Sequence, residues 1–322
     1  MSVPDTGIIR PHPLLLEALA SAGLDASEAE FTPLRPGTDS LPFAVTTRDG
    51  QDLVVKVRRA GSRSRYATAA WASTRLRDAG VPAPHVLWHS REACVETRCT
   101  GRPLEAEPPR PEDLDAAARA GDVLRRIHAI EVGSFGQLDS HGMGQHATIQ
   151  GWFLNLPSRS SPNLPDLDLQ SLLHRAQQAL QTGSKHLPSA TPRLLHGDWV
   201  GRHVFADSYR ITGVVDLESV RGGDPLAELA GWSLREPAVL TEALLAGYFD
   251  GPAPDRSLLP LSLFRLRIAV SLLHHHASCD DQSMIRLRAA QIQADLDDLD
   301  QGDPHAVPRV TPDGHSPERR RP

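Results

Sequence analysis

The chain has 322 residues, of which 40% are hydrophobic and 23% charged, as in ordinary globular proteins. Its net charge of −6 and isoelectric point near 6.2 argue against a nucleic-acid binder, whose basic face usually makes the balance positive. Only two of the 34 basic residues are lysines, Lys56 and Lys185. Lys56 stands in the apolar run Asp52-Leu-Val-Val-Lys-Val-Arg58, which makes it a candidate functional residue.

The cysteines and the N-terminal segment point to a cytoplasmic protein. Cys94, Cys99 and Cys279 have no CxxC spacing, so they indicate neither a disulfide framework nor a zinc site. The apolar stretch 14–21 is short and is interrupted by Glu17, which favours an amphipathic helix over a signal peptide. No window approaches the roughly 18 apolar residues that a membrane span needs. We therefore expect a soluble protein without a membrane or nucleic-acid partner.

The first hundred residues predict a small, mostly β unit. Two strands are joined by a short Asp-Gly turn, and a later helix is stopped by Gly80-Val-Pro-Ala-Pro84. The loop Arg35-Pro-Gly-Thr-Asp-Ser40 leads into the first of these strands. The expected order is helix, strand, strand, helix, strand, strand, at residues 12–25, 41–47, 52–57, 65–79, 86–88 and 93–96.

Helices predominate after this unit. They are expected at residues 111–130, 167–181, 224–249, 258–279 and 283–299. A β-hairpin interrupts them, with strands at 203–206 and 211–216. The last residues are rich in Pro and Arg and have no periodicity, which predicts disorder. The expected organisation is an N-terminal lobe with a leading helix at 1–98, a C-terminal lobe at 99–300 and a tail at 301–322.

The hairpin brings together the side chains that could carry chemistry. His203 opens its first strand and Asp216 closes the second, so the two should meet at one end of the hairpin. Asp198, in the tripeptide His196-Gly-Asp198, lies on the loop that enters the same end. Such a tripeptide alone is often a structural turn. With His203 and Asp216 beside it, the cluster predicts a site for a divalent cation, because two carboxylates without a cation would repel each other.

These motifs occur in the order found in a known family. The pieces are the strand with Lys56, the segment Cys99-Thr-Gly-Arg-Pro-Leu104, the His196-Gly-Asp198 loop, Gly213-Val-Val-Asp216 and Gly223-Asp-Pro-Leu-Ala-Glu-Leu-Ala230. Over roughly residues 30–300 the chain resembles the aminoglycoside phosphotransferase family, small-molecule kinases with a protein-kinase-like fold. The resemblance implies an α+β, bilobal architecture with a small β-rich N-terminal lobe that binds nucleotide and a larger helical C-terminal lobe for catalysis and substrate binding.

The resemblance also implies residue roles. Asp198 would orient the substrate hydroxyl and accept its proton, and Asp216 and His203 would hold Mg²⁺. Lys56 would contact the α- and β-phosphates of ATP or GTP, where a compact ammonium fits better than a guanidinium fork. The backbone of the loop would cover the phosphates and that of the hinge would meet the base; these residues are Gly37, Thr38, Asp39 and Ser40, and Glu96, Thr97 and Arg98.

Two positions depart from the family pattern. His203 stands where the family usually has Asn, although Mg²⁺ prefers oxygen ligands. Ala69 stands near the position of the helix glutamate that should pair with Lys56, and no acidic residue occurs between Lys56 and Asp78. Arginines occupy this stretch instead. They form either a solvated helix face or a basic edge near the phosphates or the acceptor.

The expected function is nucleotide-dependent phosphorylation of a hydroxyl on a small molecule. The leading acceptor is an aminoglycoside or another antibiotic, with resistance or self-protection as the outcome. A biosynthetic or metabolic kinase of a sugar, an amino alcohol or a macrolide is the alternative enzyme. The missing partner of Lys56 also leaves open a degenerate kinase that binds ligand without turnover.

Overall fold

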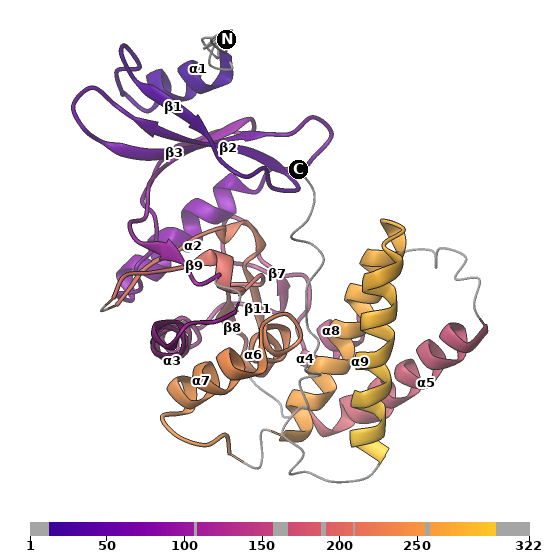
Figure 1. The fold of residues 1–322 in the computed structure, drawn as a ribbon. Helices are drawn as coiled ribbons and strands as arrows, with labels where there is room; N and C mark the ends of the chain where they lie inside the picture. The colour runs from indigo at the N-terminus through magenta and orange to yellow at the C-terminus, as the bar shows by residue number, and fades with distance from the viewer. Residues whose placement is uncertain are drawn as a thin grey trace, which may run out of the picture.

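A computed structural model describes residues 13–300 apart from 106–107, 157–166, 188–190, 209 and 255–257. The chain forms two lobes, with a β-rich lobe at the top of Figure 1 and a mainly helical lobe below it. The expected bilobal α+β architecture is therefore confirmed. The expected tail at 301–322 lies outside the described residues.

The N-terminal lobe is a five-stranded antiparallel sheet in the order β1-β2-β3-β5-β4. Alternating apolar residues on β3 bury Leu53, Val55 and Val57 against α1, which covers one face. Figure 1 shows α1 above the sheet and α2 below it, next to the C-terminal lobe. The elements are α1 (Pro13–Ser21), β1 (Glu30–Pro33), β2 (Ser40–Thr46), β3 (Asp52–Arg58), α2 (Tyr66–Asp78), β4 (Val86–His89) and β5 (Ala93–Thr97).

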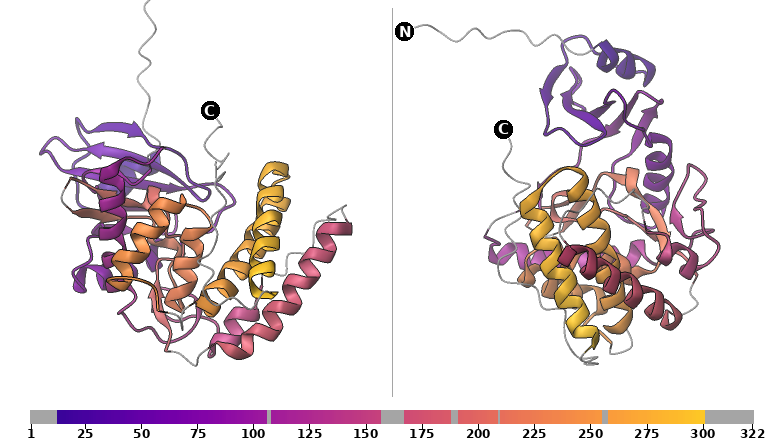
Figure 2. Two further views of the ribbon diagram at one scale, coloured as in Figure 1. Left: turned by 60° about the horizontal axis from the view of Figure 1, so that its bottom comes forward. Right: turned by 90° about the vertical axis from the view of Figure 1, so that its right-hand side faces the viewer.

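The C-terminal lobe packs its helices around two small three-stranded sheets, β10-β9-β6 and β7-β11-β8. The two views of Figure 2 place α5, α8 and α9 together at the end of the molecule away from the N-terminal sheet. The elements are β6 (Arg102–Pro103), α3 (Pro111–Ile127), β7 (Gly136–Gln137), α4 (Ile149–Leu154), α5 (Leu167–Gly183), β8 (Arg193–Leu195), β9 (Val204–Ala206), β10 (Ile211–Val214), β11 (Arg221–Gly223), α6 (Pro225–Ser233), α7 (Ala238–Phe249), α8 (Leu258–Ser278) and α9 (Gln282–Asp300).

The prediction of one continuous helix at 224–249 is wrong. It is divided into α6 and α7 by a turn at 234–237. Pro237 lacks an N–H, and a proline disfavours helical backbone at the residue before it, so the chain leaves α6 and starts again at Ala238. This break places Arg235 and Glu236 at the end of α6, near the loop that carries Asp198.

The lobes meet through α2. Its buried residues Ala69, Ala72 and Leu76 belong to the same hydrophobic core as the C-terminal lobe, whereas the core under α1 is separate. The N–H of Val214, at the end of β10, also donates to the carbonyl oxygen of Pro82 just after α2 (2.8 Å). The helix thus joins the sheet that carries Lys56 to the hairpin that leads to Asp216.

Candidate active site

The hairpin juxtaposition expected from the sequence is present. β9 and β10 pair in antiparallel register, with Val204 opposite Val214. His203 ends a short 3₁₀ turn, Gly201–His203, just before β9, and Asp216 follows β10 with a left-handed φ of 67°. Ligand atoms of Asp198, His203 and Asp216 all lie within 4.8 Å of one another.

The tautomer of His203 supports a cation between these side chains. Its Nδ1 lies 2.9 Å from the backbone carbonyl oxygen of Asp198, which can only accept, so Nδ1 carries the proton. In the neutral ring Nε2 is then unprotonated, and it lies 3.3 Å from Oδ2 of Asp216. Burial lowers the pKa of His203 to about 3 despite the nearby Asp198 carboxylate, so a proton does not relieve this contact near neutral pH. Two facing acceptors fit a divalent cation bound between them.

Asp198 is held as a carboxylate by arginines. Arg235 donates to Oδ1 (2.5 Å) and Arg202 to Oδ2 (3.3 Å). Burial alone would raise the pKa of Asp198, but the positive charges of Arg235 and Arg202 outweigh it and hold the pKa below its usual range. The side chain keeps 26% of its surface exposed, so it can still accept a hydrogen bond from a bound molecule.

The loop before Asp198 is fixed from beneath by Glu228 on α6. The two carboxylate oxygens of Glu228 accept from the backbone N–H groups of His196 (2.8 Å) and Gly197 (2.6 Å). Gly197 has a φ of +83°, and a Cβ there would lie 2.0 Å from the carbonyl oxygen of Ser219. Only glycine fits this position without displacing the loop.

Lys56 has acidic partners, but none of them comes from α2. Its Nζ lies 3.0 Å from Oε1 of Glu218, 3.2 Å from Oε1 of Glu96 and 3.9 Å from Oδ1 of Asp216. Burial would lower the pKa of Lys56, but these carboxylates raise it well above its ordinary value. Lys56 is therefore a buried cation that points at the candidate cation site.

Several of the arginines after Lys56 form hydrogen bonds or ion pairs with other parts of the chain. Arg58 pairs with Glu92 (2.7 Å), and Arg65 donates through Nε to the carbonyl oxygen of Glu218 (2.8 Å). Arg59 donates to the carbonyl oxygen of Gly37 through its side chain and to that of Asp39 through its backbone N–H. Arg75 and Arg77, by contrast, are exposed on α2 and fit the solvated helix face.

The loop with Gly37, Thr38, Asp39 and Ser40 joins β1 to β2 at the end of the sheet near Lys56. Ser40 stands opposite Arg58 and Pro42 opposite Lys56 in the β2–β3 register. Besides the contacts of Arg59, the hydroxyl of Ser62 donates to the carbonyl oxygen of Asp39 (2.8 Å). The segment 59–62 therefore fixes the position of this loop.

The hinge residues have unequal positions. The side chain of Glu96 is buried against Lys56. The N–H of Thr97 donates to the carbonyl oxygen of His85, and that of Arg98 to the carbonyl oxygen of Asp52 (both 3.0 Å). Neither of these two amides is thus available to donate to a base.

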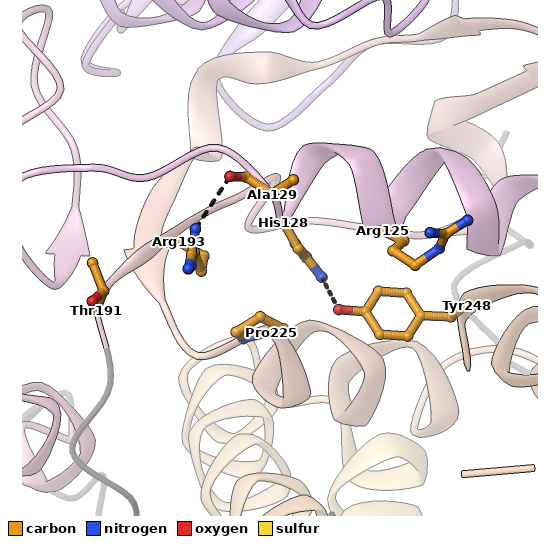
Figure 3. A pocket seen from close by; sticks show the side chains of 7 residues that line it. All are labelled: Arg125, His128, Ala129, Thr191, Arg193, Pro225 and Tyr248. Atoms are coloured by element: carbon orange, nitrogen blue, oxygen red, sulfur yellow. Dashed lines mark hydrogen bonds between the residues drawn. The ribbon is translucent and has the colours of Figure 1, made fainter. Parts of the chain in front are cut away.

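A separate pocket of about 510 Å³ opens on the C-terminal lobe at the end of α3 (Figure 3). In it, Nδ1 of His128 meets the hydroxyl of Tyr248 (2.9 Å), while Nε2 contacts Glu228 (3.2 Å). None of the site residues expected from the sequence lines this pocket. The pocket is connected to Asp198 through side-chain contacts: His128 contacts Glu228, and Glu228 holds the loop that carries Asp198. The lining residues are Arg125, His128, Ala129, Thr191, Arg193, Pro225 and Tyr248.

Sequence reasoning missed three side chains of the site: Glu218, Arg235 and Glu236. Glu218 lies two residues after Asp216, and this proximity was an available signal. Arg235 contacts Asp198, and Glu236 accepts from the N–H of Gly201 (2.8 Å). Both lie more than thirty residues from the loop that they hold, so no local pattern identified them.

Among the described residues, no helix is both long and apolar enough to span a bilayer. No curated protein matches the chain. Solved structures do match it. Because their sequence identities to this chain are low, these matches show only that the fold is shared. A thermostable mutant of aminoglycoside phosphotransferase APH(4)-Ia in a ternary complex with ADP and hygromycin B is 21% identical with a TM-score of 0.72, over 88% of this chain and 97% of that chain.

Two further similar structures carry different names. A choline/ethanolamine kinase family protein from Mesorhizobium loti is 19% identical, with a TM-score of 0.66 over 87% of this chain and 92% of that chain. Macrolide 2′-phosphotransferase MphH from Brachybacterium faecium is 18% identical, with a TM-score of 0.54 over 86% and 97%. The model of the phosphotransferase enzyme family (APH) matches residues 30–260, which include Lys56, Asp198 and Asp216. The chain therefore belongs to the phosphotransferase enzyme family.

Proposed function

We propose that the protein transfers the γ-phosphate of ATP or GTP, with Mg²⁺, to a hydroxyl of a small molecule. The observation that carries this proposal is the convergence of Asp198, His203, Asp216 and Lys56 where the two lobes meet. Phosphoryl transfer needs positioning and charge neutralisation more than covalent chemistry, and this set offers both. With three free cysteines, the protein would act in the cytoplasm.

Each residue has a distinct part in this proposal. Asp198, kept ionised by Arg235 and Arg202, orients the acceptor hydroxyl and takes its proton late, when bond formation has made the oxygen acidic. Lys56 binds the α- and β-phosphates. Asp216 and His203 hold Mg²⁺, which supplies charge neutralisation of the phosphates when bound.

The backbone elements around the nucleotide complete the proposal. The loop from Gly37 to Ser40, fixed by Arg59, covers the phosphates. The base contacts the backbone of 96–98 through carbonyl oxygens, since the amides of Thr97 and Arg98 already have acceptors. The carboxylate partners of Lys56 also remove the main reason for regarding the protein as a degenerate kinase.

An aminoglycoside or another antibiotic is the acceptor that we propose. The first similar structure was solved with hygromycin B and ADP. The net charge of −6 favours the approach of a polycationic acceptor. A biosynthetic or metabolic kinase for a sugar, an amino alcohol or a macrolide is the alternative, which the same assay distinguishes.

The test is transfer of labelled phosphate from ATP or GTP to a panel of aminoglycosides, macrolides, amino alcohols and sugars, with and without Mg²⁺. We expect transfer to at least one aminoglycoside, and a loss of about 100-fold or more in Asp198→Asn, because the amide cannot accept the proton. Susceptibility of cells that express each form provides the cellular readout.

Asp122→Asn is the matched control, because this carboxylate pairs with Arg125 on the surface. We expect its transfer rate to equal that of the wild type. Transfer that persists in Asp198→Asn, or its absence with every acceptor while the protein is folded, would refute the proposed function.

A further inference from the structure

The ion pair that positions the nucleotide-binding lysine in kinases normally uses a glutamate on the helix after the lysine strand. Here that helix is α2, and its buried residue Ala69 stands near the expected position. The first turn of α2 contains no acidic residue. The lysine nevertheless lies in a buried environment, with 10% of its side chain exposed. A buried ammonium without a partner would be costly, so the structure has to supply carboxylates from elsewhere.

Glu218 supplies the nearest of these carboxylates, and its Oε1 accepts a hydrogen bond from Nζ of Lys56 at 3.0 Å. It lies on the short 3₁₀ turn Leu217–Ser219, directly after Asp216. The left-handed backbone at Asp216 reverses the chain so that Asp216 contacts His203 while Glu218 contacts Lys56. One turn therefore carries both the candidate cation ligand and the partner of the lysine.

The position of this turn is itself fixed. Arg65, the residue before α2, donates through Nε to the backbone carbonyl oxygen of Glu218 (2.8 Å) and also to that of Leu138. Glu96 plays a different part, because it lies on β5 in the same sheet as Lys56 and moves with it. Contact with Glu218, by contrast, fixes the lysine relative to the C-terminal lobe.

We propose that Glu218 is the positioning residue for Lys56 and replaces the helix glutamate of other kinases. The proposal rests on the proposed function, in which Lys56 binds the nucleotide phosphates. Because Asp216 and Glu218 share one turn, the lysine and the cation ligand keep a constant spacing whenever the lobes are closed. The position of Lys56 then depends on the contact between the lobes, not on a carboxylate carried by α2.

The composition of the chain makes the test direct. With only Lys56 and the exposed Lys185 in the sequence, ¹³C-labelled lysine gives two side-chain NMR signals. We expect the Lys56 signal of Glu218→Gln to shift toward the position of a solvent-exposed lysine, while that of Lys185 stays unchanged. This readout needs neither nucleotide nor acceptor, so it is independent of the proposed function.

Kinetics provide the second readout. Glu218→Gln should raise the KM for nucleotide and lower kcat/KM about 10- to 100-fold, the effect of losing a hydrogen bond to a charged group. In a Lys56→Met background the same substitution should change kcat/KM less than about threefold, because the interaction is already absent. Glu92→Gln is the matched control, since its partner Arg58 lies on the same strand but outside the site.

The possible results separate the two proposals. An unchanged Lys56 signal in folded Glu218→Gln, or an equal kinetic effect with and without Lys56, would overturn the role of Glu218. If the Lys56 signal shifts in Glu218→Gln but the wild-type protein binds no nucleotide, the role of Glu218 is supported and the proposed function is refuted.

Discussion

At the scale of single residues, His203 is the most informative departure from the family pattern. Its side chain is 11% exposed and lies between Asp198 and Asp216. Burial lowers its pKa to about 3, whereas a histidine in the unfolded chain titrates near 6.5. The unfolded state therefore takes up a proton as pH falls below about 6.5, and the folded state does so only near pH 3. The contribution of His203 to stability is thus lost as pH falls through this range.

We predict that the free energy of unfolding of the wild type falls by about 2 kcal/mol between pH 7 and pH 5 from this residue alone. In His203→Asn this contribution is absent, so the difference between the two pH values should be smaller by that amount. Urea unfolding at both pH values measures it. The variant should keep phosphotransfer, because an amide oxygen is a suitable ligand for Mg²⁺. Equal pH dependence in the two proteins would contradict the predicted protonation state.

At the scale of elements, the loop with Asp198 depends on α6. The chain reaches α6 from β11 through Asp224, whose side chain accepts from the N–H of Leu226 and caps the helix. This start orients Glu228 toward the N–H groups of His196 and Gly197. The break before Pro237 then places Arg235 on Asp198. Both ends of one short helix thus hold the same loop.

Glu228→Gln should destabilise the protein by about 1–3 kcal/mol, because its one carbonyl oxygen cannot replace both carboxylate oxygens and a buried N–H loses its acceptor. Urea unfolding measures the change. Glu131→Gln is the control: its carboxylate pairs with Arg193 at the surface with 64% of the side chain exposed, so the effect should be within about 0.5 kcal/mol. Equal effects of the two substitutions would contradict the proposed anchoring.

At the scale of the whole molecule, the lobes are joined by polar contacts that meet at one turn. Lys56 from the sheet and Arg65 from the start of α2 both bind Glu218, through its side chain and its backbone respectively. α2 also shares its core with the C-terminal lobe. The relation between the lobes therefore depends on the turn that carries Asp216 and Glu218.

We predict that Arg65→Met increases amide exchange about tenfold or more at the start of α2 and at residues 217–219, because two carbonyl oxygens lose a charged donor. Exchange in β2 and β3 should stay unchanged. Hydrogen–deuterium exchange with mass spectrometry measures this. Arg75→Met, on the same helix but stacked over Trp71, is the control. Unchanged exchange at 217–219 would show that Arg65 does not fix the turn.

Much of this architecture could be predicted from local patterns. Short-range sterics and burial determine these elements. Examples are the alternating apolar residues of β2 and β3, the helical period of α3 and the end of α2 before Gly80. The strands β7, β8 and β11 have two or three residues each, too few for any period, and exist because neighbouring chain segments supply their hydrogen bonds. The sequence likewise could not divide α6 from α7 at the correct residue.

The sequence by itself placed Asp198, His203 and Asp216 together, because a hairpin joins its own ends and requires no knowledge of the rest of the chain. The partner of Lys56 was decided by the tertiary structure. Glu218 is separated from it by 162 residues and meets it only because the lobes close on each other. A buried cation accepts whichever carboxylate the packing brings within reach, and sequence distance places no limit on that choice.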